Sequence, residues 1–183
     1  MIGRFRVFFG FLAGGMFALM CHPAPTFRLA AGLLVAFLGL LLRGWAAGYL
    51  EKGRRLAQDG PYSFLRHPLY AGSFLIALGL VAAGTNFRYE IHVVIVLLIF
   101  LGLFLGVYPR RIREEEFTLE QIFGDAWRAF AARNHRFLPS LPCRREGADS
   151  FSWVRYRKNR EYQAALGYAA GVALILLKRR FGL

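Results

Sequence analysis

The chain has 183 residues, of which 56% are hydrophobic and 19% are charged, and its net charge is +13. Soluble domains carry fewer apolar and more charged residues, and here the apolar residues gather in long runs separated by basic loops, as in membrane proteins. Basic chains can also bind nucleic acid, but the sequence contains no nucleic-acid-binding motif, so we expect no such partner. We expect the positive charge to face the anionic headgroups of the bilayer.

Four apolar segments approach the length of about 20 helical residues that a bilayer requires. Residues 5–21 form the first, and the His-Pro-Ala-Pro sequence at 22–25 then breaks the helix. Because that sequence is a poor cleavage site and another apolar run follows, a retained span is favoured over a signal peptide. The second span is predicted at 27–49, the third, short and glycine-containing, at 69–84, and the fourth at 91–108.

Loop charge predicts the orientation of these spans. The connection at 51–67 and the segment after Pro109 are strongly basic, whereas the connections at 22–26 and 85–90 carry Arg88 as their only cation. Cytoplasmic loops carry the excess of Lys and Arg. We therefore expect the two basic regions to meet on the cytoplasmic side of the membrane.

The C-terminal part, residues 150–183, combines a basic interfacial segment with a short apolar helix. Residues 151–162 interleave aromatic and basic side chains, which is typical of an interfacial segment. Residues 162–177 are apolar but form a segment shorter than a typical span, and three cations follow them. A crossing would place these cations outside, against the charge rule. A crossing helix and an in-plane or re-entrant helix therefore both remain open, and we favour the crossing. The sequence thus predicts one all-α domain over 1–183, an integral membrane bundle of four to five transmembrane helices.

Residues 60–72 contain two proline breaks between apolar helices. Proline removes a backbone donor and turns the preceding residue away from the α region, so carbonyls and amides are left free near the membrane. Arg66 and His67 add a cation and a titratable ring, and Tyr62 and Tyr70 add hydroxyl groups and flat aromatic faces. The segment could hold a ligand that bears a carboxylate and an aromatic ring, or it could be an interfacial elbow.

Three consecutive glutamates, at 114–116, follow the fourth span. Successive helical residues are about 100° apart, so the three carboxylates cannot share one face and at least one should point toward the protein. A carboxylate near the bilayer needs a partner, which here is Arg66 or the ammonium group of a ligand. A solvated face with Arg–Glu pairs is the alternative.

A further segment, at 123–139, is predicted to form a lid. Gly124 could end one helix and Asp125 begin the next, and Trp127 and Phe130 would share one face. An ordinary amphipathic surface helix is the alternative. The histidines and the two cysteines have no metal-ligand spacing, so no metal site is expected.

Together, these residues resemble the isoprenylcysteine carboxyl methyltransferase family and its phospholipid N-methyltransferase relatives. The family pattern is Gly-Pro-Tyr, then Arg-His-Pro-x-Tyr-x-Gly, then a distant Glu-Glu pair and a closing Arg-Phe-Leu-Pro. The matching positions are 60–62, 66–72, 115–116 and 136–139, and the resemblance covers roughly 44–139. Trp127 and Phe130 stand where the family commonly has tyrosines.

The resemblance implies an integral membrane enzyme that uses S-adenosylmethionine as its cofactor, in a helical site facing the cytoplasm. The implied cofactor-binding residues are Gly60, Pro61, Tyr62, Arg66, His67, Pro68, Tyr70, Glu115 and Glu116. Glu116, with Glu115, would hold the cofactor's ammonium group, and a lipid substrate would enter between spans. The residues assigned to catalysis are Tyr70, Arg133 and Arg136, the two arginines as groups that orient an acidic acceptor.

Four functions remain open, and the first of them is the one that we favour. The first is methylation of a carboxylate on a prenylcysteine-like or other lipidic acid, and the second is N-methylation of an aminophospholipid headgroup. The third is a non-catalytic membrane protein that retains the cofactor site, and the fourth is a reductase of related membrane architecture. The residues specify neither the acceptor nor an oligomeric state.

Overall fold

The computed structural model describes residues 12–140 and 149–182, and every regular element in these ranges is helical. After a helix at 12–20 come α2 (Thr26–Ala47), the 3-10 helix η1 (Gly60–Ser63), α3 (Pro68–Gly84), α4 (Glu90–Leu101), the π-helix η2 (Gly102–Val107), α5 (Tyr108–Phe123), α6 (Asp125–Arg133), α7 (Trp153–Lys158) and α8 (Tyr162–Phe181). The predicted all-α class is confirmed for the described residues.

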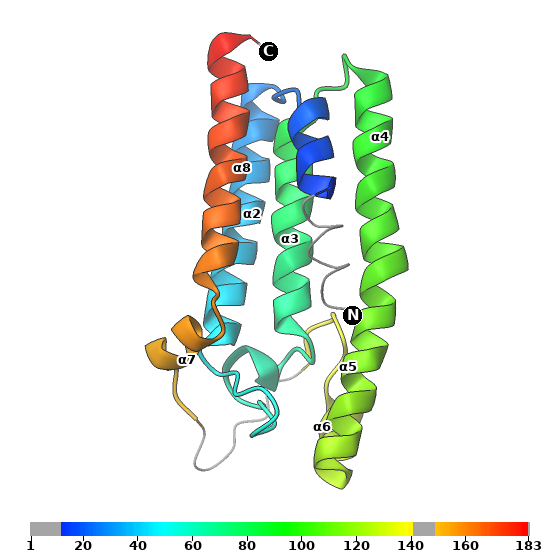
Figure 1. The fold of residues 1–183 in the computed structure, drawn as a ribbon, viewed down its shortest axis with the longest axis vertical. Coiled ribbons are helices and arrows are strands. Elements are labelled where there is room, and N and C mark those ends of the chain that lie inside the picture. The colour runs from blue at the N-terminus through cyan, green and yellow to red at the C-terminus, as the bar shows by residue number, and fades with distance from the viewer. Residues whose placement is uncertain (1–11, 141–148, 183) are drawn as a thin grey trace.

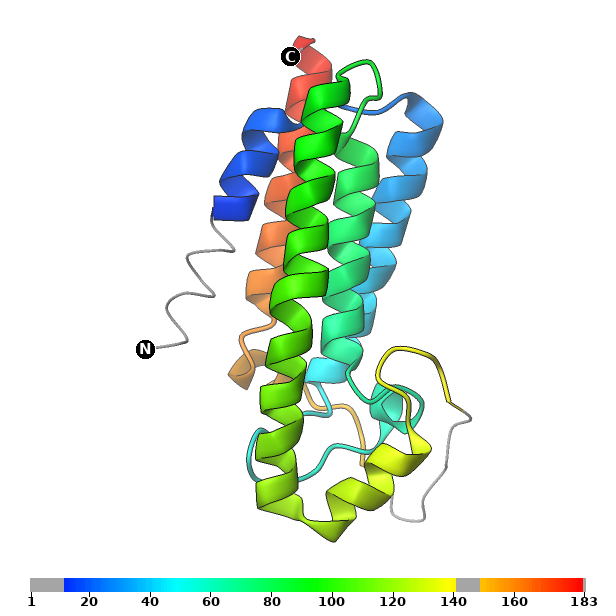
Figure 2. The ribbon, with the colours of Figure 1, turned by 90° about the vertical axis from the view of Figure 1, so that its right-hand side faces the viewer.

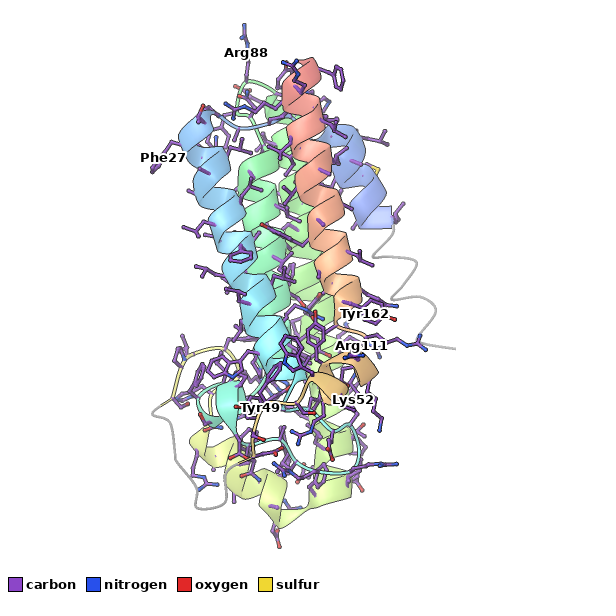
Figure 3. All side chains as sticks on the ribbon, turned by 90° about the vertical axis from the view of Figure 1, so that its left-hand side faces the viewer. Phe27, Tyr49, Lys52, Arg88, Arg111 and Tyr162 are labelled. Atoms are coloured by element: carbon purple, nitrogen blue, oxygen red, sulfur yellow. The ribbon has the colours of Figure 1, made fainter. Side chains whose placement is uncertain are left out.

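The long helices α2, α3, α4 and α8 run side by side along the long axis of the molecule (Figure 1), and a view turned by 90° agrees (Figure 2). One end carries the segment at 50–67 with η1, and also α6 and α7; we call it the polar end. Lys52 and Arg111 lie at this end, and Phe27 and Arg88 lie at the opposite end (Figure 3). The expectation that the two basic regions meet at one end of the bundle is confirmed.

Two helices are long and apolar enough to cross a membrane by length and composition: α2, and the continuous rod from Glu90 to Phe123. Only 28% and 11% of their apolar windows are buried within the protein, so most of this apolar surface faces outward. Helix α2 covers most of the second predicted span, at 27–49, and the rod contains the fourth, at 91–108. The third, α3, is apolar but has 17 residues, and the first lies partly outside the described residues. The count of four to five spans stays a prediction.

The rod formed by α4, η2 and α5 is longer than a bilayer requires. Its 34 residues would extend for about 50 Å, against an apolar layer of about 30 Å. The apolar residues end at Tyr108, so α5 continues beyond them and carries the glutamates at 114–116 toward α6 at the polar end (Figure 1).

Helices α2 and α3 pack backbone against backbone through glycines. A Cβ atom added at Gly79 would lie 2.4 Å from the backbone nitrogen of Ala36 and 2.4 Å from the carbonyl oxygen of Gly32. One added at Gly39 would lie 2.7 Å from the carbonyl oxygen of Gly72. Small residues allow this close approach between apolar helices.

We predict that Gly79→Ala lowers the free energy of unfolding by about 1–3 kcal/mol, because the new methyl group meets backbone atoms that cannot rotate away. Gly167→Ala is the control, since a Cβ atom there meets nothing within 4 Å. Thermal unfolding of both variants in one detergent measures the difference. Equal midpoints would contradict the close α2–α3 contact.

Helix α8 runs antiparallel to α2 along the bundle rather than across its end (Figure 1). Its Ile175 is fully buried in a cluster with Leu29 and Ala83, and Arg179 near its C-terminal end donates a hydrogen bond of 2.8 Å to the Thr26 hydroxyl. The 20-residue helix therefore reaches the end opposite the polar end. This arrangement favours the crossing over the in-plane alternative, and a membrane crossing by α8 stays a prediction.

Candidate active site at the polar end

The Gly60-Pro61 break forms a tight turn that leads into a small core. Gly60 has a φ of +58°, and a Cβ atom there would lie 2.7 Å from the ring of Tyr49, so only glycine fits. Tyr62 is buried in a cluster with Ala46, Ala57, Trp127 and Phe130. Burial, together with the negative charges of nearby carboxylates, raises the pKa of the Tyr62 hydroxyl. The phenol therefore stays protonated as a core residue.

The second break presents two side chains to α5. Helix α3 starts at Pro68, and Arg66 and His67 precede it. The Arg66 Nη1 atom lies 2.8 Å from Oε1 of Glu116, and the His67 Nε2 atom lies 3.1 Å from the same oxygen. Because an ionised carboxylate only accepts hydrogen bonds, His67 donates through Nε2. One of the three glutamates thus faces the protein and pairs with Arg66, as expected.

A third cation completes the cluster around Glu116. Arg136, from the segment after α6, donates to Oε1 at 3.0 Å and to Oε2 at 2.5 Å. Burial opposes ionisation of Glu116, but the hydrogen bonds from His67, Arg136 and Arg66 outweigh it and hold the pKa of the carboxyl below its usual range. Glu116 is therefore a charged carboxylate whose side chain is only 12% exposed.

Arg66 also fastens the segment at 123–139, the predicted lid, to the rest of the site; its role as a lid stays a prediction. Its Nη2 and Nε atoms donate to the carbonyl oxygens of Ala131, at 2.5 Å, and Asn134, at 3.0 Å. The Asn134 side chain in turn donates to the Tyr62 carbonyl oxygen at 2.8 Å. The helix break at Gly124 and the start of α6 at Asp125 are as expected. The side chains of Trp127 and Phe130, both from α6, are buried against Tyr62.

A row of aromatic rings leads from the site along α3 and the π-helical segment. The Tyr70 ring lies 5.8 Å from that of His67 and 5.4 Å from that of Tyr108. Phe104 follows at 4.4 Å from Tyr108, and Phe74 at 5.1 Å from Phe104. π-Helical turns inside α-helices occur frequently at functional sites, and here η2 presents Phe104 to this row.

The structure brings together part of the predicted set of site residues. Arg66, His67, Glu116 and Arg136 form one cluster, and Tyr70 lies beside it. Pro61, Tyr62 and Pro68 are buried in the packing around the breaks. Glu115 is exposed one residue away from the cluster, and the exposed Arg133 donates to the Ala129 carbonyl oxygen of its own helix at 3.1 Å.

Sequence reasoning missed three polar contacts. The Asn134 side chain binds the Tyr62 carbonyl oxygen and so holds the predicted lid in place. Its position directly after Arg133, the last residue of α6, is the sequence feature that could have indicated it. Arg43 and Glu161 form an ion pair across 118 positions. At the opposite end of the bundle, the His22 and His92 ring nitrogens lie 2.8 Å apart, and in the described residues no group of three or more potential ligands surrounds a metal position.

Residues 47–121, which include both proline breaks and Glu116, match the model of the isoprenylcysteine carboxyl methyltransferase family. This match supports the resemblance to that family expected from the sequence. The match ends before α6, so the lid, α7 and α8 lie outside the matched residues.

Three curated proteins are similar to the chain, and one of them is an isoprenylcysteine methyltransferase. The chain is 35% identical over 123 residues to the nickel-cobalt-cadmium resistance protein NccN of Alcaligenes xylosoxydans xylosoxydans, covering 63% of this chain and 54% of NccN. It is 35% identical over 115 residues to the cobalt-zinc-cadmium resistance protein CzcN of Cupriavidus metallidurans, covering 62% of this chain and 50% of CzcN. Over 92 residues it is 31% identical to the protein-S-isoprenylcysteine O-methyltransferase of Schizosaccharomyces pombe, covering 50% of this chain and 36% of that enzyme.

The chain thus spans about half the length of the two resistance proteins and a smaller part of the yeast enzyme. No solved structure shows a significant match to it.

Proposed function

We propose that the protein is a membrane methyltransferase that uses S-adenosylmethionine and methylates a carboxylate on a lipidic acceptor, with its site on the cytoplasmic side. One observation carries the proposal: Arg66 and His67, from the first half of the family pattern, reach the same oxygen of Glu116, from the second half. Two segments about 50 positions apart therefore build one charged site. The match of residues 47–121 to the family model supports the reaction class.

The residues of the cluster fit the charged groups of this cofactor. Glu116 is an ionised carboxylate with the charge that an ammonium group needs. Its partner Arg136 has a side chain that is 49% exposed, whereas the side chains of Arg66 and His67 are 16% and 4% exposed. Arg136 is therefore the partner that would give way to the ammonium group, and it would then pair with the carboxylate of the cofactor or the acceptor.

When bound, S-adenosylmethionine would supply an activated methyl group on a positively charged sulfur, and that sulfur would leave as a neutral thioether when the acceptor oxygen takes the methyl group. An acceptor carboxylate is already ionised at neutral pH, so the protein needs no strong general base and contributes mainly by alignment. The guanidinium groups of Arg66 and Arg136 attract and orient an anionic acceptor. The buried face of α6, with Trp127 and Phe130, excludes water from this side of the site.

The aromatic row supports a lipidic acceptor. It joins the charged cluster to outward-facing apolar surface on α3 and η2, where Phe74 is 38% exposed and Leu105 is 72% exposed. An apolar tail could lie along these rings while its polar end reaches Tyr70 and the cations. The metal-resistance names of two relatives describe those proteins, and the charged cluster of this chain contains no metal-ligand set.

The test is methyl transfer from methyl-labelled S-adenosylmethionine in membranes that contain the protein. We expect label in the lipid or lipidated-protein fraction that alkali releases as methanol, since carboxyl methyl esters hydrolyse in base. Membranes with the Glu116→Gln variant are the control. Alkali-stable label in aminophospholipids would favour N-methylation instead, and cofactor binding without a labelled product would favour the non-catalytic alternative. Absence of binding in calorimetry would overturn the proposal.

A further inference from the structure

A second buried ionic contact lies one helical turn from the site, between α2 and the start of α8. The Arg43 Nε atom lies 2.5 Å from Oε1 of Glu161, and its Nη2 atom lies 3.0 Å from Oε2. The Glu161 side chain is 5% exposed and that of Arg43 is 22% exposed. The pair is therefore bidentate and largely shielded from water.

A buried ion pair is a weak source of stability, because both ions lose their hydration and apolar residues of similar volume often stabilise a fold as well or better. Such pairs have their best-attested use in fixing one arrangement of elements among several. The function of the pair is therefore inferred from the elements that it holds in place, and not from its contribution to the free energy of unfolding.

Arg43 extends the pair to the first turn of α3. Its Nη1 atom donates to the Leu69 carbonyl oxygen at 3.2 Å and also to the Ser73 hydroxyl, which itself donates to Leu69 at 2.9 Å. The stem of Arg43 passes directly over Gly72, where an added Cβ atom would lie 2.5 Å from its Cγ atom. The final glycine of the Arg-His-Pro-x-Tyr-x-Gly pattern thus makes room for this arginine.

Glu161 is itself held against the end of α2. The Asn159 side chain donates to the carbonyl oxygens of Ala47 and Leu50, both at 2.9 Å. Arg155 donates to the Gly48 carbonyl oxygen at 3.3 Å and pairs with Asp149. Two side chains of the segment that leads into α8, Asn159 and Arg155, therefore bind backbone carbonyl groups at the C-terminal end of α2 and place Glu161 opposite Arg43.

We propose that Arg43 and Glu161 are positioning residues for the active site, which hold the first turn of α3, and with it His67 and Tyr70, in register with Glu116. Arg43 and the C-terminal segment that carries Glu161 both lie outside the family match at 47–121, and together they would support residues inside it. The inference takes the roles of His67 and Tyr70 from the proposed function.

The decisive variant is the double substitution Arg43→Met with Glu161→Leu, which removes both charges and keeps similar volumes. A pair with a purely structural role predicts unchanged melting and unchanged turnover, because apolar residues replace it. A positioning pair predicts a wild-type melting midpoint, hydrogen exchange over residues 66–73 that is at least about tenfold faster, and turnover at least about tenfold lower. A double variant in which neither exchange nor turnover changes would overturn the proposal.

A second variant covers the case in which the double variant does not fold. Arg43→Lys keeps a charge for Glu161 but lacks the second nitrogen that reaches Leu69 and Ser73. We expect it to fold and to exchange faster over 66–73; exchange equal to that of the wild type would reject the proposal. Removing the exposed Arg128–Glu120 pair with two glutamines is the matched control and should change nothing.

Hydrogen exchange does not depend on methyl transfer, so the two proposals fail separately. A wild-type protein that transfers no methyl group would reject the proposed function, whereas the exchange of the variants still decides whether the pair holds the first turn of α3.

Discussion

Glu116→Gln is expected to weaken binding of S-adenosylmethionine by about 1.5–3 kcal/mol, which is roughly a tenfold to more than a hundredfold rise in Kd. Glutamine keeps the size and one acceptor oxygen but removes the charge that would face the ammonium group of the cofactor. It also leaves the cations Arg66 and Arg136 without their shared counter-ion. Isothermal titration calorimetry on the purified protein in detergent measures the effect.

Glu115→Gln is the matched control, because it removes the same charge one residue away on the exposed side of α5. Equal losses in the two variants would indicate a general charge effect, and unchanged affinity in Glu116→Gln would show that another group holds the ammonium.

The pH dependence of cofactor binding provides a separate check on Glu116. Its pKa is lowered in the folded protein, so the carboxylate stays ionised through the range near pH 4.3 where a free glutamate takes up a proton. Its contribution to stability is present above that ordinary pKa and is lost only as the pH falls through the lower folded value. Binding should therefore show no titration of this group between about pH 5 and pH 8.

The sequence predicted the local breaks in the fold well, because proline and glycine act on their own backbone. Helix α3 begins at Pro68, η1 begins at Gly60, and Gly124 separates α5 from α6, each where the residue itself forbids or permits the conformation. The two long apolar helices follow equally directly from composition. These features need no knowledge of distant contacts.

The site was predicted less completely, because helical phase and loop paths depend on packing. Glu115 and Glu116 are alike in sequence, and only the docking of α5 turns Glu116 toward Arg66. Arg133 and Arg136 were equal candidates for contact with a ligand. The end of α6 leaves Arg133 bonded to its own helix and brings Arg136 back to Glu116.

Contacts between distant segments were beyond the sequence. Arg43 lies near the end of the second predicted span, and nothing in the neighbouring sequence indicates Glu161 as its partner. The contact of His22 with His92 likewise depends on how two connections meet at the end opposite the site. The number of helices that cross the membrane stays a prediction from the lengths of the apolar segments. The side that the site faces stays a prediction from loop charge.

Arg66→Met is expected to have the largest effect on stability of any single substitution in the cluster, a loss of about 3–5 kcal/mol, as for breaking a buried ion pair. Arg66 links three parts of the site: it pairs with Glu116 and donates to the Ala131 and Asn134 carbonyl oxygens. Its loss should also release the lid, so protease cleavage within 124–140 should become faster. Chemical unfolding and limited proteolysis measure the two effects.

Arg66→Lys separates the charge of Arg66 from its geometry. Lysine can still pair with Glu116, but its single ammonium cannot also reach both lid carbonyl oxygens in the way that a planar guanidinium does. We therefore expect most of the stability to return while the lid remains open to protease, with Arg128→Gln, in an exposed ion pair, as an unaffected control. Wild-type resistance to protease in Arg66→Lys would mean that packing of Trp127 and Phe130 holds the lid, and that Arg66 acts only as a counter-ion.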